Sequence, residues 1–69
     1  MSIKVQWIQD SELLFENAVT HKREWYGSDM FKGNVMEFSD VVSGNSKEIK
    51  LMCIDGEIAI VKAFAIRFI

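Results

Sequence analysis

The sequence predicts a small, mainly β domain in which a strongly bent antiparallel sheet closes into a barrel after one N-terminal helix. Three observations favour this fold class. Apolar segments flank Asp55-Gly56, a dipeptide typical of tight hairpin turns. Gly33 interrupts a strand-like stretch from Met30 to Phe38, as glycine does at the corner of a small barrel. Asp10 and Ser11 precede an apolar run and offer side-chain oxygens that cap a helix.

Length and composition limit what the chain can be. Its 69 residues predict one domain, residues 1–69, and a hydrophobic share of 49% argues against disorder. The chain has no apolar run near the roughly 18 residues of a membrane span and no signal-peptide core, so we expect a cytoplasmic protein. The single cysteine, Cys53, provides no internal disulfide, and this favours oligomerisation of so small a core. The net charge of −2 excludes a strongly basic nucleic-acid-binding surface but not a local patch.

A strand and a helix are expected in the first half of the chain. Residues 3–8 alternate apolar and polar side chains, as a half-buried strand does. A helix is predicted to begin near Ser11 and to end between residues 19 and 26, before Gly27, which suits a C-cap. His21-Lys22-Arg23 is interpreted as a solvated face of that helix.

The second half is predicted to contain strands and turns. Residues 43–46 have the composition of a loop. Residues 49–54 and 57–69 are expected to form a hairpin around a two-residue type I′ turn. The expected pairs are Cys53 with Ile58, Leu51 with Ile60, and Ile49 with Lys62.

The segment after the turn is too long for one ordinary strand. We therefore expect a break near residues 62–65. Residues 65–69 would then form a short apolar edge strand, a feature that invites pairing with another subunit.

No pattern of residues predicts an enzyme. Metal sites need several His, Cys or carboxylate ligands at defined spacings, and this chain has one His and one Cys, far apart. Cys53 lies on the predicted apolar face of the hairpin, which favours a buried structural thiol over a nucleophile. We expect no catalytic residues, metals or cofactors. An enzyme dependent on Cys53 or His21 is the least favoured alternative.

Four aromatic residues are candidates for stacking on nucleic-acid bases. Packing in the core or in a subunit interface is the favoured interpretation for each of them. Phe64 is the most open case, because the predicted break places it in a turn. The four are Trp7, Trp25, Tyr26 and Phe64.

Residues 27–69 resemble the Sm/Lsm family and its Hfq-like branch. Phe31-Lys32-Gly33-Asn34-Val35-Met36-Glu37-Phe38 matches the first Sm motif, from the apolar residue and glycine through the aromatic. Residues 60–69 resemble the closing strands of the second motif, especially at Ala65-Ile66 and the terminal apolar residue. Ser39 departs from the family, which usually has Asp there. The resemblance implies an Sm-like (SH3-like) barrel whose first strand comes from residues 3–8 or 19–26.

The resemblance also implies a function. Sm-like subunits join edge to edge into homo-oligomeric rings of five to seven, and the rings bind single-stranded RNA. In this chain Lys62 would meet a phosphate, Phe64 would stack on a base, and Asn45 would contact a base edge. The implied nucleic-acid-binding residues are Asp40, Ser43, Asn45, Lys62 and Phe64. The implied oligomer interface consists of Ala65, Ile66, Phe68 and Ile69.

Two functions therefore stay open from the sequence. The first is non-catalytic binding of single-stranded RNA or DNA by a ring, with a role in RNA processing or chaperoning. The alternative is a small phage or mobile-element module that binds or inhibits a host protein through an exposed apolar sheet face. Mild acidity and the lack of a basic patch favour the alternative.

Overall fold

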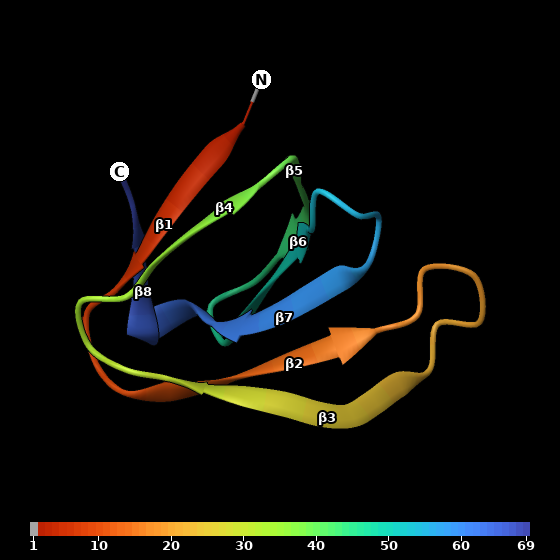
Figure 1. Cartoon of the computed structure of the whole chain (residues 1–69), viewed down its shortest axis with the longest axis horizontal. Coiled ribbons are helices and arrows are strands. Elements are labelled where there is room, and N and C mark those ends of the chain that lie inside the picture. Colours follow the sequence, from red (N-terminus) through yellow and green to blue (C-terminus); the bar gives the residue numbers. More distant parts are fainter. Residues whose placement is uncertain (1) are drawn as a thin grey trace.

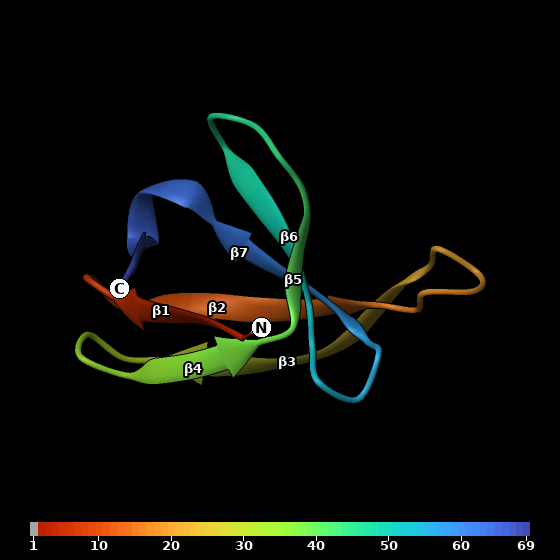
Figure 2. The same ribbon diagram turned by 90° about the horizontal axis from the view of Figure 1, so that it is seen from above.

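A computed structural model describes residues 2–69, apart from the side chains of residues 24–28. Over this range the chain forms two antiparallel sheets and one short 3-10 helix (Figures 1 and 2). One sheet has the order β4 (Val35–Phe38), β1 (Ile3–Trp7), β8 (Ile66–Phe68). The other has the order β3 (Arg23–Met30), β2 (Ser11–Glu16), β7 (Ile58–Lys62), β6 (Glu48–Met52), β5 (Asp40–Gly44). The described part contains no helix long and apolar enough to cross a membrane.

The chain is mainly β, but the predicted closed barrel is wrong. Within the described residues each sheet keeps two edge strands, β4 and β8 in one and β3 and β5 in the other. The chain passes between the sheets at a bend around Ser39, whose amide donates to the carbonyl of Met52 at 2.9 Å. It passes back through the 3-10 helix η1 (Ala63–Ala65), which leads into β8. The chain also crosses between the sheets from β1 to β2 and from β3 to β4, and at none of these crossings do the strands form the continuous ladder that a barrel requires.

The predicted N-terminal helix is also wrong, because its residues form the hairpin of β2 and β3. β2 is hydrogen-bonded on both sides, to β3 and to β7. Its side chains alternate, so Leu13 is buried in the core while Leu14 lies on the opposite face. Leu13, Leu14 and Phe15 follow one another with no polar residue between them, so this strand lacks the alternation by which a half-buried strand is recognised in a sequence.

The residues that were interpreted as helix signals have other roles. The Asp10 carboxylate accepts a hydrogen bond from the Lys32 amide at 2.8 Å, rather than capping a helix. Gly27 lies inside β3. His21-Lys22-Arg23 is exposed, as expected, but it occupies the β2–β3 loop and the first position of β3.

The β6–β7 hairpin forms, but its predicted register is wrong by one residue. Met52 lies opposite Ile58 and Leu51 opposite Ala59, in place of the expected Cys53–Ile58, Leu51–Ile60 and Ile49–Lys62 pairs. The cause is the loop, in which Cys53 and Glu57 enclose three residues. The Cys53 amide donates to the Glu57 carbonyl at 2.7 Å, and Gly56 has a φ of 95°. Such loops place glycine where the positive φ is needed.

The two other predicted breaks in the second half are present. Gly33 turns the chain, although it does so between β3 and β4 rather than within a strand. The Asn34 amide donates to the Phe31 carbonyl at 3.0 Å, and Gly33 has the positive φ, 97°, of the third residue of a type II turn. η1 interrupts the long C-terminal segment at residues 63–65, as expected.

The core lies between the two sheets. Its largest fully buried side chains are those of Trp7 and Phe38 from one sheet and of Leu13 and Leu51 from the other. Burial of this apolar surface is the main favourable term for so short a chain. Of the four aromatic residues singled out above, Trp7 is therefore a core residue and Phe64 is exposed. The side chains of Trp25 and Tyr26 lie outside the described residues.

Candidate binding site

Three of the residues implied to bind nucleic acid lie together at one end of the β6–β7 hairpin. The Asn45 amide donates to the carbonyl of Glu48, and Glu48 lies opposite Lys62. The Ala63 amide donates to the Lys47 carbonyl at 3.0 Å, so the β5–β6 loop touches η1, which carries Phe64. We call Asn45, Lys62 and Phe64 the loop end.

The polar groups at the loop end are partly engaged. The Asn45 side-chain oxygen accepts from the amides of Lys47 and Glu48 at 2.8 and 2.9 Å. Glu48 accepts from Arg23 at 2.8 Å, so a carboxylate lies beside Lys62. The Phe64 side chain is 59% exposed. The loop end therefore offers the exposed aromatic ring of Phe64 and the lysine Lys62. Glu48 pairs with Arg23 and lies opposite Lys62.

The other two residues lie on β5. Ser43 lies opposite Lys50, two positions before Asn45. Asp40 lies at the far end of β5, opposite Met52, and its carboxylate accepts from the Val41 amide at 2.8 Å. Asp40 is therefore separated from the loop end by the length of the strand.

The four implied interface residues divide into two pairs. Ala65 and Ile66 are buried in the core of the single chain, with exposed fractions of 0% and 6%. Phe68 and Ile69 are more than half exposed, at the end of edge strand β8. Only this second pair is accessible to another molecule.

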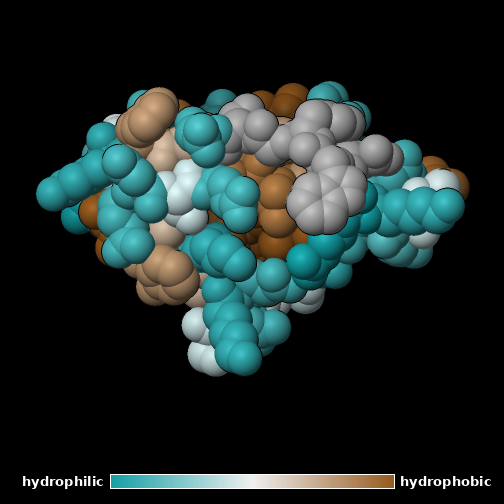
Figure 3. Space-filling model, turned by 90° about the horizontal axis from the view of Figure 1, so that it is seen from below, coloured by the Kyte–Doolittle hydropathy of each residue, from teal (hydrophilic) through white to brown (hydrophobic). Residues whose placement is uncertain are grey.

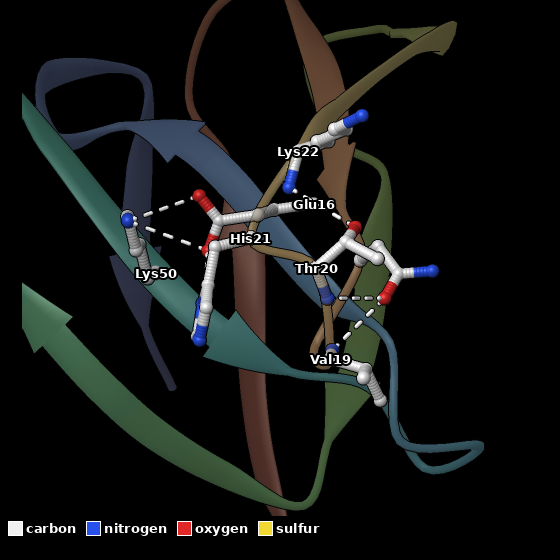
Figure 4. A network of polar contacts seen from close by, with 7 residues as sticks. Glu16, Val19, Thr20, His21, Lys22 and Lys50 are labelled. Carbon is white, nitrogen blue, oxygen red and sulfur yellow. Dashed lines mark hydrogen bonds and ion pairs between the residues drawn. The ribbon is translucent and has the colours of Figure 1, made fainter.

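A network of charged and polar groups covers part of the outer face of the five-stranded sheet (Figure 4). Glu16 is buried, and its carboxylate lies 3.2 Å from Lys50 Nζ and 3.9 Å from His21 Nδ1. The Asn17 side chain fixes the adjoining loop by accepting from the amides of Val19 and Thr20. Seen from the side of β2 and β3, hydrophobic atoms show near the centre of the view, with hydrophilic atoms to their left and below them (Figure 3).

A cleft opens between β2, β4 and the β6–β7 turn. Its volume is about 430 Å³, and more of its lining is apolar than polar. We call it the acidic cleft, since three carboxylates border an otherwise apolar lining. Its residues are Phe15, Met36, Glu37, Cys53, Ile54, Asp55 and Glu57.

Cys53 lies in this cleft as a neutral thiol. Burial is the main cause that raises its pKa to about 11, and the negative charges of Asp55 and Glu57 raise the pKa further. A thiol with this pKa is almost fully protonated at neutral pH and is a poor nucleophile. Cys53 therefore acts as part of the apolar lining.

Sequence reasoning did not find the acidic cleft. Its residues come from three distant segments, and Asp55 was interpreted only as a turn residue. The signal available was the run Ile54-Asp55-Gly56-Glu57, which places two acids and an apolar side chain in one hairpin loop. In the part of the chain that the structure describes, no three His, Cys, Asp or Glu side chains are grouped so that they could hold a metal ion.

Comparisons with known proteins found no matching family model, no similar curated protein and no similar solved structure. The resemblance to the Sm/Lsm family therefore receives no support from them.

Proposed function

We propose that this chain is a non-catalytic protein-binding module that uses the acidic cleft as its contact surface. One observation carries the proposal: a concave, mostly apolar surface stays open to solvent where Phe15 and Met36 pack against the core. Clefts of about this size hold one or a few side chains of a partner.

The surface around the cleft supports binding to protein. Ile54, at the tip of the β6–β7 turn, is 70% exposed although it is one of the most apolar side chains in the chain. Ile54 lines the cleft together with Phe15 and Met36, and an apolar surface of several residues with a polar border is typical of interaction sites. The net charge of −2 gives no general attraction for nucleic acid.

A photo-crosslinking experiment tests this proposal. A photoreactive amino acid replaces either Ile54, at the cleft, or Phe64, at the opposite end of the same hairpin. Crosslinking is carried out in lysate of the source cells, with and without nuclease. We expect the Ile54 variant to form a protein adduct that survives nuclease and that the Phe64 variant lacks. Equal adducts from both positions, or none from Ile54, would contradict the proposal.

A second candidate function is binding of single-stranded RNA or DNA at the loop end. The observation that favours it is the hydrogen bond from Ala63 to Lys47, which holds the exposed Phe64 ring close to the loop that contains Asn45. An exposed ring beside a lysine suits a stacked base and its phosphate. The homo-oligomer of five to seven subunits that the resemblance implies belongs to this candidate function.

Labelled oligouridine tests the second candidate. At low salt, Phe64→Ala is expected to weaken binding by about tenfold if the ring stacks on a base. Phe31→Ala, which removes an equally exposed ring elsewhere, is the matched control. Binding that is absent, or that both variants weaken equally, would remove this candidate. Light scattering of the same sample reports whether the chain is oligomeric.

A further inference from the structure

We propose that the acidic cleft accepts a lysine or arginine side chain from a basic, partly apolar segment of the partner protein. The inference rests on the proposed function, because it specifies the chemistry of the partner at the same site. Two features of the cleft support the inference: the negative charge of its border and its apolar lining.

The border of the cleft is negative on two sides. Glu37 contributes a carboxylate from β4, and Asp55 and Glu57 contribute two more from the β6–β7 turn. Among the described residues, those that line the cleft include no lysine, arginine or histidine. A cation entering between these carboxylates would be attracted from both sides, and a second acidic protein would be repelled.

Nearby cations do not form an ion pair with Glu37 within the described contacts. Lys4 lies opposite Glu37 in the register of β1 and β4, yet no ion pair within 4 Å joins them. Lys50, from the neighbouring strand β6, pairs with Glu16 on the other face of the sheet. Glu37 accepts a hydrogen bond from the Ser2 hydroxyl at 2.8 Å, which orients its carboxylate without removing the charge.

The lining of the cleft suits the aliphatic part of such a side chain. Phe15 and Met36 are partly buried hydrophobic residues that pack against the core, and Ile54 adds an exposed apolar group at the border. Lysine and arginine place their methylene groups on apolar surface and keep the charged end near acids and water. A free carboxylate or phosphate ligand fits neither the apolar lining nor the negative border.

The chemistry of Cys53 is consistent with a negative potential inside the cleft. The Asp55 and Glu57 carboxylates disfavour a thiolate there, after the larger effect of burial. The same carboxylates would favour a positive charge at that position. The raised pKa of Cys53 therefore agrees with a negative electrostatic potential at the place where a bound cation would lie.

Peptide titrations followed by NMR of the full, ¹⁵N-labelled chain test the inference. The probe is a blocked six-residue peptide of alternating leucine and arginine. Two matched peptides carry glutamine or glutamate in place of each arginine. We expect the arginine peptide to shift the amide signals of Glu37, Ile54 and Asp55 in a saturable way. The glutamine peptide should bind at least about fivefold more weakly and the glutamate peptide should not bind.

Two charge-neutralising double variants test whether the carboxylates of the acidic cleft cause the binding of the arginine peptide. The double variant Glu37→Gln/Asp55→Asn keeps the acceptors for Ser2 and for the Glu57 amide but removes two charges from the cleft. It should raise the Kd of the arginine peptide by about fivefold. Asp10→Asn/Glu12→Gln removes two charges beside a different hollow and should change the Kd by less than about twofold.

The possible results distinguish the proposed protein-binding function from the inferred binding of a cation. If none of the three peptides shifts the cleft signals, both the inference and the cleft as a protein-binding site are contradicted. If the glutamine or glutamate peptide binds at the cleft as tightly as the arginine peptide, the proposed function stands and the inferred cation does not. Equal weakening by both double variants would also overturn the inference, because it would indicate attraction to net charge alone.

Discussion

At the scale of single residues, surroundings decide the chemistry of Cys53. From the sequence it is a lone cysteine on an apolar hairpin, and a structural thiol was the favoured interpretation. In the structure it is 7% exposed, between the core and the acidic cleft. Its protonated form suits both neighbours, because an apolar core and nearby carboxylates each disfavour a thiolate.

The thiol predicts a pH dependence of stability. Its pKa is about 11 in the folded chain against an ordinary value of 9.0, so the folded state holds the proton more tightly than the unfolded state. The resulting stabilisation is complete below pH 9 and is lost as the pH rises through about 11. Urea unfolding should show a loss of up to about 2 kcal/mol over this range, and Cys53→Ala should not show that part of the loss.

Cys53→Ala also provides the control, because other groups titrate at high pH in both proteins. The difference between the two unfolding free energies isolates the thiol. A difference that stays constant from pH 8 to pH 11 would contradict the assigned pKa.

At the scale of elements, one ion pair in the five-stranded sheet skips a strand. Glu16 on β2 reaches Lys50 on β6 across the intervening β7. The Glu16 carboxylate is buried, so it depends on this cation more than a solvated acid would. The pair therefore links the N-terminal hairpin to the C-terminal hairpin.

A double-mutant cycle measures this link. Lys50→Met leaves the buried carboxylate without its nearest cation and should lower the free energy of unfolding by about 1–2 kcal/mol. Glu16→Gln combined with Lys50→Met should cost less than the sum of the single changes, with a coupling near 1 kcal/mol. Arg23→Met, which breaks the more exposed Arg23–Glu48 pair, should cost less than about 0.5 kcal/mol. A coupling of zero for Glu16 and Lys50 would mean that the contact does not stabilise the fold.

The positions of the strands and turns could be predicted from the sequence only in part. Local rules located β1, the glycine turn at Gly33 and the break at η1, because each depends on a few neighbouring residues. They wrongly predicted a helix over β2, because the consecutive apolar residues Leu13, Leu14 and Phe15 lack the alternation by which strands are recognised. They also misplaced the β6–β7 register, because Asp-Gly suits both two- and three-residue loops.

The candidate site is less predictable than the elements, for a physical reason. The acidic cleft needs Phe15, Glu37 and Asp55 to meet, and only the topology of the two sheets brings them together. The loop-end residues were named only from the resemblance to the Sm/Lsm family, and in the structure Asn45 and Lys62 belong to adjacent parts of one meander.

At the scale of the whole molecule, the first and last strands are partners. β1 lies between β4 and β8 in the smaller sheet, with Val5 opposite Phe68. Trp7 lies opposite Ile66, and both are buried. One face of the core thus depends on residues at both ends of the described chain.

Removal of residues 66–69 tests this dependence. The truncated chain loses β8 and the burial of Ile66, so we expect loss of cooperative thermal unfolding by circular dichroism. Ile69→Lys changes an exposed residue beyond β8 and should alter the free energy of unfolding by less than about 0.5 kcal/mol. A truncated chain that still unfolds cooperatively near the original temperature would show that β8 is dispensable.

The partnership of β1 with β8 has a consequence for synthesis in the cell. The ribosome makes β1 first and β8 last, so β1 waits with its β8 edge unpaired until Phe68 has left the exit tunnel. The smaller sheet therefore completes only after translation of this segment ends. Until then the nascent chain exposes Val5 and Trp7, and a chaperone that recognises short apolar strands would find them during this interval.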